Sequence, residues 1–410
     1  MHVKPLRHCA MAIVVIAVAC ALAPAGSLWP SPAGGAAIAG EAYAYAPLTP
    51  WRKPRVVLPQ PRLLDYAGLA EEGMTHAGDW KTGSWYCEYL RCKCPNCSHG
   101  YYPLATIWGS VALFEAVDAL AQSDPTPAHK QLVDRFARQF ERYWNPHVRG
   151  FAPYPDDRGS GVETWFDDNG WLGIAFLEAF RATKSHAYLS DANKAFEFAV
   201  HYGWDASAGG GMWWNTDHPY HSGPALASQS LLGMLLYSED HESWQLEEVK
   251  TFIDWANAND VGDERKLYLE KPNDPNSVND YVQAPLVYAQ YLLCQDGEGQ
   301  AYCERAGRVA ATMSEQDVNH SGYRFNYGPD YDAIYLQWMM AYGQAVGDPY
   351  WMELAQVNAA AAEKHAADGA GLWLGSWWGG PIADPETHPE MLRTEGSTTS
   401  LFAWLSVYAH

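Results

Sequence analysis

Cations are scarce in this sequence. The 410 residues include 27 Lys and Arg against 48 Asp and Glu, which gives a net charge of −21 at pH 7. Such an acidic surface repels phosphate backbones and anionic lipids, so we expect neither nucleic acid nor a membrane surface as a partner. Charged residues make up only 18% of the chain and hydrophobic residues 48%, which is the composition of a protein with a sizeable core.

Long apolar runs are absent after the first 25 residues, so we expect no membrane span. Residues 1–25 combine a basic start, an apolar stretch and small residues at the end, which predicts a signal peptide. An alternative is a lipoprotein that is anchored through Cys20. Residues 26–50 are rich in Ala, Pro and Gly and are typical of a linker. We therefore expect a secreted protein whose folded part covers residues 51–410.

Removal of the leader leaves six cysteines, and an exported chain permits disulfides. Cys294 and Cys303 bracket a Gly-containing turn between two helical stretches, so we predict a disulfide that closes a helical hairpin. The other four crowd one loop and favour two disulfides, with one tetrahedral zinc site as the alternative. Either arrangement would fix the loop without carrying chemistry, and we expect no other cofactor. These four residues are Cys87, Cys92, Cys94 and Cys97.

Strands have little support, because no strongly β-branched run alternates with polar residues. Apolar residues recur at helical spacing and predict twelve helices. The links alternate between short and long, and short links make antiparallel hairpins. Six hairpins that close in a ring give a single-domain, all-α (α/α)6 toroid with six inner and six outer helices. An open array of helical pairs is the alternative, although no fixed-period repeat supports it. The predicted helices are 61–77, 105–122, 126–144, 166–183, 186–202, 220–238, 243–259, 278–296, 299–315, 330–346, 349–366 and 396–409.

Aromatic residues and glycine concentrate in the long connections, which gather at one end of such a ring. The chain has 19 Trp and 25 Tyr, and aromatic rings stack on the apolar faces of sugars. For any single ring, packing over the helical core is the simpler explanation. For the set, we predict a carbohydrate cleft at this end. The candidate substrate-binding residues in these loops are Trp213, Trp214, Asn215, Tyr323, Trp373, Trp377 and Trp378.

Two adjacent carboxyl groups, Asp167 and Asp168, stand at a predicted helix start at the same end. Such a pair is usually a cap and a partner of the helix dipole. However, Trp165 and Trp171 flank it, and glycosidases need two carboxyl groups, which retaining enzymes hold about 5–5.5 Å apart. Adjacent helical residues reach that separation. We therefore expect Asp167 and Asp168 to be catalytic, with Asn169 and Trp171 binding substrate beside them.

The Asp-Asp-Asn-Gly-Trp segment at Asp167–Trp171 resembles a motif of glycoside hydrolase family 76, the α-1,6-mannanase family. Gly209–Trp214 is similar to the Gly-Gly-Gly-x-Trp-Trp segment of the same family. The resemblance implies an (α/α)6 toroid and retaining hydrolysis of α-1,6-mannosidic linkages. It also implies, by analogy, that Asp167 is the nucleophile and Asp168 the acid/base.

We expect a monomeric, secreted glycoside hydrolase that attacks α-1,6-linked mannan or related mannose-containing glycans, in endo fashion. Two alternatives stay open. One is a transglycosidase that acts on cell-wall or anchor glycans, and the other is a non-catalytic sugar-binding toroid whose Asp pair only caps a helix. An epimerase on the same scaffold is disfavoured by the leader, because such enzymes use His pairs and are usually cytosolic.

Overall fold

The computed structural model describes residues 55–92, 104–262, 266–315, 320–321, 324–325, 328–380 and 390–409. The predicted leader and linker, and with them Cys94, Cys97 and Tyr323, lie outside the described residues. In the described part, α-helices dominate and the strands form two-residue antiparallel pairs. The helices are α1 (Tyr66–His76), α2 (Ile107–Ser123), α3 (Pro127–Phe140), α4 (Phe166–Thr183), α5 (His186–Phe198), α6 (Gly223–Asp240), α7 (Ser243–Asn259), α8 (Asp280–Gln295), α9 (Gln300–Glu315), α10 (Pro329–Val346), α11 (Tyr350–His365) and α12 (Leu392–Tyr408). The strands are β1 (Lys81–Thr82) with β2 (Trp85–Tyr86), β3 (Trp144–Asn145) with β4 (Gly150–Phe151), and β5 (His320–Ser321) with β6 (Arg324–Phe325).

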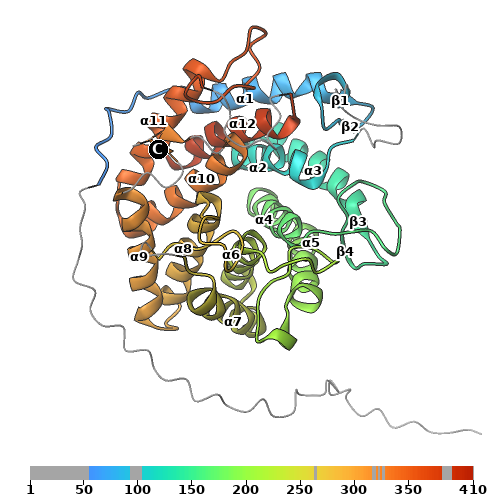
Figure 1. The fold of residues 1–410 in the computed structure, drawn as a ribbon. Helices are drawn as coiled ribbons and strands as arrows, with labels where there is room; N and C mark the ends of the chain where they lie inside the picture. Colours follow the sequence, from blue (N-terminus) through green and yellow to red (C-terminus); the bar gives the residue numbers. More distant parts are fainter. Residues whose placement is uncertain are drawn as a thin grey trace, which may run out of the picture. The chain divides into compact units, whose positions relative to one another are not determined.

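The even-numbered helices form a closed inner ring. Each contacts the next, from α2 through α4, α6, α8 and α10 to α12, and α12 packs against α2. The odd-numbered helices lie outside this ring, and α1 pairs with α12 (Figure 1). The predicted (α/α)6 toroid is therefore confirmed, including the pairing of the first helix with the last.

The sequence separates inner helices from outer ones. Outer helix α3 buries only Val133, Phe136, Ala137 and Phe140, which is one stripe at helical spacing. Inner helix α12 buries every residue from 392 to 406. A helix with one apolar stripe lies at a surface, whereas a helix that is buried on all sides lies within the core.

The two ends of the ring differ in how the chain turns. At the short links, α4, α6 and α10 end on residues with left-handed backbone, Lys184, His241 and Gly347, which reverse the chain within a few residues. The long connections instead lead into the N-termini of the inner helices, where side chains such as Thr106 cap the first turn. All six inner N-termini therefore meet at the end where the long connections gather.

Two disulfides lie in the described part of the chain. Cys294 bonds Cys303 with a Cα–Cα distance of 5.4 Å and joins the end of α8 to α9, as predicted. Cys87 bonds Cys92, so one of the disulfides expected in the cysteine-rich loop is present.

One helix boundary differs from the prediction in a way that affects the site. Helix α12 begins at Leu392, four residues before the expected start, so that Arg393 and Glu395 lie in its first turn. Among the described helices, none has the length and apolar character needed to cross a membrane.

Candidate active site

Asp167 and Asp168 lie in the first turn of α4, at the end where the inner N-termini meet. The backbone of this turn is tied to the loop before α6, because Phe166 N donates to Trp214 O at 3.0 Å. Helices α4 and α6 also approach closely, since a Cβ on Gly170 would lie 2.2 Å from Ser228 Oγ. Both carboxyl side chains remain partly accessible. The fold therefore holds the pair rigidly but does not seal it.

The two carboxyl groups have different environments. Burial raises the pKa of Asp167 to about 6, and the charge of Glu270 adds to this rise. The backbone N–H groups of Asp167 and Asp168 and the indole N–H of Trp214 oppose this rise and lower the pKa of Asp167. Three donors therefore favour the ionised form of Asp167.

Asp168 has a different balance. Burial, the negative charge of Asp167 and that of Glu88 hold its pKa well above the usual range. The positive charge of Arg393 opposes this rise. Two carboxyl groups this close do not ionise independently, and the proton stays on the one with fewer donors. The environments thus favour an ionised Asp167 beside a protonated Asp168.

Aromatic side chains from several inner helices surround the pair. Tyr281 on α8 lies 4.8 Å from Tyr331 on α10 and 6.3 Å from Trp171 on α4, measured between ring centroids. Trp108 on α2 lies 5.8 Å from Tyr331. Trp214 stacks on Tyr220 with centroids 5.2 Å apart. These rings form apolar walls next to carboxyl groups, which is the composition of a sugar-binding cleft.

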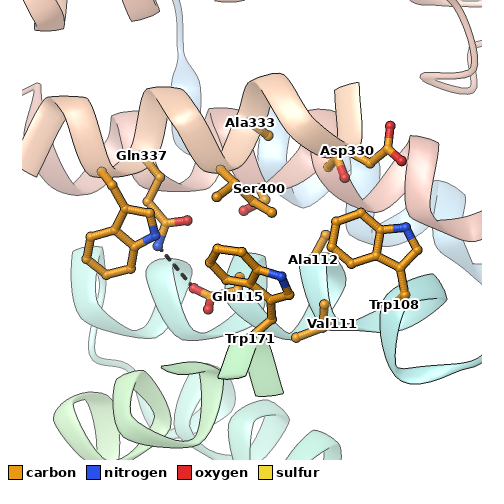
Figure 2. A pocket seen from close by; sticks show the side chains of 12 residues that line it. Trp108, Val111, Ala112, Glu115, Trp171, Asp330, Ala333, Gln337 and Ser400 are labelled. Carbon is orange, nitrogen blue, oxygen red and sulfur yellow. Dashed lines mark hydrogen bonds between the residues drawn. The ribbon is translucent and has the colours of Figure 1, made fainter. Parts of the chain in front are cut away.

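A cavity of about 450 Å³, part of which is open to solvent, lies among α2, α4, α10 and α12. Trp108 lies at one end of it, Gln337 donates a hydrogen bond to Glu115 towards the other, and Trp171 lies between them (Figure 2). Trp171 follows Asp167 by one helical turn, so the cavity begins directly below the carboxyl pair.

The two asparagines that we expected to bind substrate have structural roles instead. The Asn169 amide is fully buried and hydrogen-bonds Phe151 N, Phe151 O and Trp165 O. Asn215 is 1% exposed, donates to Glu163 and accepts from Asp217 N. In the structure, these amides hydrogen-bond the loops that frame α4.

The six tryptophan candidates separate into groups. Trp171 and Trp214 lie at the carboxyl pair, as described above. Trp373 and Trp377 are only 3% and 2% exposed, and Trp377 Nε1 donates to Thr398 Oγ1 at 2.9 Å. The structure therefore does not support sugar stacking on these two rings, since packing already covers their faces.

The other two tryptophans are half-buried. Trp213 stacks on His218 with centroids 5.0 Å apart and packs against His221 at 4.3 Å. Trp378 donates to Asn358 Oδ1 at 3.2 Å. Both rings thus have protein partners, and Tyr323 lies outside the described residues.

The model of glycosyl hydrolase family 76 matches residues 85–276, which include the carboxyl pair. The match covers just under half of the chain and supports the resemblance to this family. Members of family 76 are glycoside hydrolases, and the family resemblance predicted from the sequence is confirmed. A comparison with curated proteins gives no match.

Solved structures share the fold of this chain. A family 76 α-mannanase of Bacteroides thetaiotaomicron superposes with a TM-score of 0.71 at 18% identity, over 84% of this chain and 96% of that one. An α-1,6-mannanase of Salegentibacter sp. gives 0.67 at 17% identity, over 84% and 99%. A cellobiose 2-epimerase of Bacillus thermoamylovorans gives 0.56 at 11% identity, over 82% and 98%. At these identities, the likeness shows the toroid alone.

The sequence analysis missed several residues of this candidate site. Glu88 precedes α2, Glu270 precedes α8, and Tyr281, Asp330 and Arg393 lie in the first turns of α8, α10 and α12. Position was the available signal for Tyr281, Asp330 and Arg393, which lie at the starts of inner helices. Glu88 and Glu270 lie farther back, in the long connections that lead to α2 and α8.

Proposed function

We propose that the chain is a secreted, retaining endo-glycosidase that cleaves α-1,6-linked mannan or related mannose-containing glycans. The observation that carries the proposal is the carboxyl pair. Two adjacent carboxyl groups have different donors and charges around them, within a chain of a glycoside hydrolase family.

Asp167 is the proposed nucleophile. An ionised carboxylate attacks the anomeric carbon and forms a covalent glycosyl–enzyme intermediate. The Trp214 indole and two backbone N–H groups stabilise that ionised form. The N-terminus of α4 adds its positive dipole end, which also favours the charged form.

Asp168 is the proposed acid/base. A protonated carboxyl group donates its proton to the departing glycosidic oxygen, and the resulting carboxylate then takes a proton from water in the second step. Burial and the neighbouring negative charges favour the protonated form that begins this cycle. Retention follows if the carboxylate attacks directly, which the adjacency of the two residues supports.

A neighbour's chemistry supports the substrate class. In the Salegentibacter enzyme, replacement of two adjacent aspartates by alanine is described as an inactive variant in complex with α-1,6-mannotetrose. In this chain, Asp167 and Asp168 are likewise adjacent, and Trp108, Tyr281 and Tyr331 supply ring faces nearby.

Export and monomeric action belong to the same proposal. Residues 1–25 have the pattern of a signal peptide, with lipid attachment at Cys20 as the alternative. The bonds Cys87–Cys92 and Cys294–Cys303 support an oxidising compartment. Mass spectrometry of the mature N-terminus from the native host would separate cleavage near residue 26 from a lipidated Cys20.

The activity is tested on α-1,6-mannan and a panel of other α-glycans, with product sizes and the anomeric configuration of the first product measured by NMR. We expect oligosaccharides of mixed length that first appear as the α-anomer. Longer products on addition of acceptor sugar would favour the transglycosidase instead. A β-anomer as the first product would refute retention.

Variants of the pair test the roles. Asp167→Asn should abolish turnover while leaving binding of oligosaccharide intact. Asp168→Asn should slow the first step, least for substrates with good leaving groups. If both variants cleave as fast as the parent, the pair is a helix cap and the chain is a sugar-binding toroid or uses other residues.

A further inference from the structure

Arg393 is a buried cation in the first turn of α12, among carboxyl groups of three other segments. Its side chain is 8% exposed, and Nε lies 3.3 Å from Asp330 Oδ2 at the start of α10, which is 2% exposed. A buried charge is costly unless it is paired, so its position requires an explanation beyond solubility.

Glu88 is the second carboxyl group in this set. Its carboxylate accepts hydrogen bonds from Thr106 N at 2.7 Å and Thr106 Oγ1 at 3.0 Å, at the start of α2. The Cys87–Cys92 disulfide closes the short loop that contains Glu88. The negative charge of Glu88 raises the pKa of Asp168, and the charge of Arg393 lowers the pKa of Glu88 and of Asp168.

Backbone contacts fix the distance between Arg393 and Glu88. Leu392 N, the residue before Arg393, donates to Glu88 O at 2.9 Å, and Tyr89 pairs with Met391 in an antiparallel bridge. The cysteine-rich loop and the first turn of α12 are therefore one unit. This unit carries one positive and one negative side chain towards the α4 carboxyl pair.

Three charged groups act on Asp168 directly and a fourth acts through one of them. Asp167 shares its helix, Glu88 comes from the loop before α2, Arg393 from α12, and Asp330 reaches it through its ion pair with Arg393. In the described part of the chain, Arg393 is the one positive charge that lowers the pKa of Asp168.

We propose that Arg393 is a positioning residue for the hydrolysis, which keeps the neighbouring acid/base carboxyl group able both to give a proton and to take one back. The proposal rests on the assignment of Asp168 as the acid/base. An acid/base must titrate near the working pH, because a carboxyl group that never ionises cannot serve as the base in the second step. Burial and two negative charges raise the pKa of Asp168, and Arg393 supplies the positive charge that lowers it.

The test compares the pH dependence of kcat/KM in four variants on a glycan that the parent cleaves. The basic limb of this profile reports the proton of the acid/base in the free enzyme. Arg393→Gln removes the positive charge and should move the basic limb upward by about 0.5 pH unit or more. Arg393→Lys retains the charge and should restore a limb close to that of the parent.

Asp330→Asn provides the opposite change. It removes the negative partner of Arg393, so the positive charge acts on Asp168 with less compensation, and the basic limb should move downward. Arg181→Gln is the matched control, because Arg181 also pairs with two carboxylates, Glu178 and Glu239, but away from the pair. This variant should lower the Tm and leave the limb in place.

Opposite shifts in Arg393→Gln and Asp330→Asn support the proposal, because a loss of packing cannot move the limb in two directions. An unmoved limb in Arg393→Gln, with activity lost equally at all pH values, would overturn it and leave Arg393 a structural residue of α12. If the parent cleaves no glycan, the proposed function fails by itself.

Thermal unfolding tests the effect of the Arg393 charge on Asp168 without any substrate. The Tm gain from Asp168→Asn, measured against pH in the parent and in the Arg393→Gln background, reports where Asp168 titrates. In the Arg393→Gln background, the Tm difference caused by Asp168→Asn should keep growing up to a higher pH than in the parent. Identical curves in the two backgrounds would refute the proposal.

Discussion

Glu115 offers a quantitative test of how much folding free energy it costs to ionise a side chain in the cavity below the carboxyl pair. Its side chain lines that cavity and is 8% exposed. Burial chiefly, and the charge of Glu178 in addition, raise the pKa of Glu115 to about 8, against the hydrogen bond from Gln337. Glu115 is therefore mostly protonated at neutral pH, and ionising it should cost folding free energy.

The cost follows from proton linkage. The unfolded chain releases this proton near pH 4.5 and the folded chain near pH 8, a gap that corresponds to at most about 5 kcal/mol. The folded state binds more protons between these values, so stability is highest below pH 4.5 and falls as the pH rises towards 8. Relaxation and water entry make the real loss smaller than this bound.

Glu115→Gln keeps an acceptor of the same shape and removes the titration. At pH 4.5 its Tm should lie near that of the parent, and at pH 8 it should be higher. With an unfolding entropy of about 2.1 cal/mol/K per residue, the gain over the folded part is at most about 6 °C. Thermal unfolding followed by circular dichroism at half-unit steps measures it.

A surface substitution provides the control for this experiment. Glu363 pairs with Arg62 and is partly exposed, so Glu363→Gln should show no gain that grows with pH. A Tm difference between Glu115→Gln and the parent that stays constant from pH 4.5 to 8 would refute the reasoning. It would mean that Glu115 ionises in the fold as easily as in water.

Two further predictions follow from contacts in the structure. Replacing both Cys294 and Cys303 by Ser should lower the free energy of unfolding by about 2–3 kcal/mol, because the disulfide closes a short loop. Denaturation in urea measures this loss. No change would mean that packing alone holds the hairpin. Trp214→Phe removes the indole N–H that lowers the pKa of Asp167, so kcat/KM should fall about tenfold and the acidic limb of its pH profile should move upward. Trp377→Phe should instead lower the Tm with unchanged kinetics. A change in kcat/KM would mean that Trp377 contributes to substrate binding.

Much of the fold could be predicted because local sequence patterns specify the helices and the order in which they are linked. Helical periodicity predicts the twelve helices, and the alternation of short and long links predicts the ring. The start of α12 could not be predicted in this way. Gly396 suggests a break in a helix, yet it lies within α12. A Cβ there would lie 3.2 Å from Leu113 N of α2, so close packing requires a glycine that propensity disfavours.

The error at α12 had a consequence for the site. With the helix start placed at residue 396, Arg393 fell into an irregular loop, and its approach to Asp330 was not visible. The same holds for Glu88, which lies within a cysteine-rich loop that we expected to fix structure without carrying chemistry. Ion pairs between residues about 60 to 300 positions apart depend on how the ring closes, which spacing alone does not reveal.

The choice among tryptophans shows a second limit. Composition correctly predicts that rings gather at the long-loop end, but it does not tell which face of each ring is covered. Trp214 reaches Asp167, whereas Trp377 hydrogen-bonds Thr398 inside the core. Adjacent loops decide this difference, and their path is set by contacts such as that of Phe166 N with Trp214 O.

The location of the carboxyl groups at this end of the ring has a physical reason. The six inner helices run in the same direction, so six N-termini, each equivalent to roughly half a positive charge, face the long loops. Asp167, Asp280, Asp330 and Glu395 all occupy first turns at this end. The dipoles offset part of their mutual repulsion in a chain whose net charge is already −21. Among the described residues, Arg393 adds a buried positive charge in the first turn of α12, where it pairs with Asp330 and lowers the pKa of Asp168.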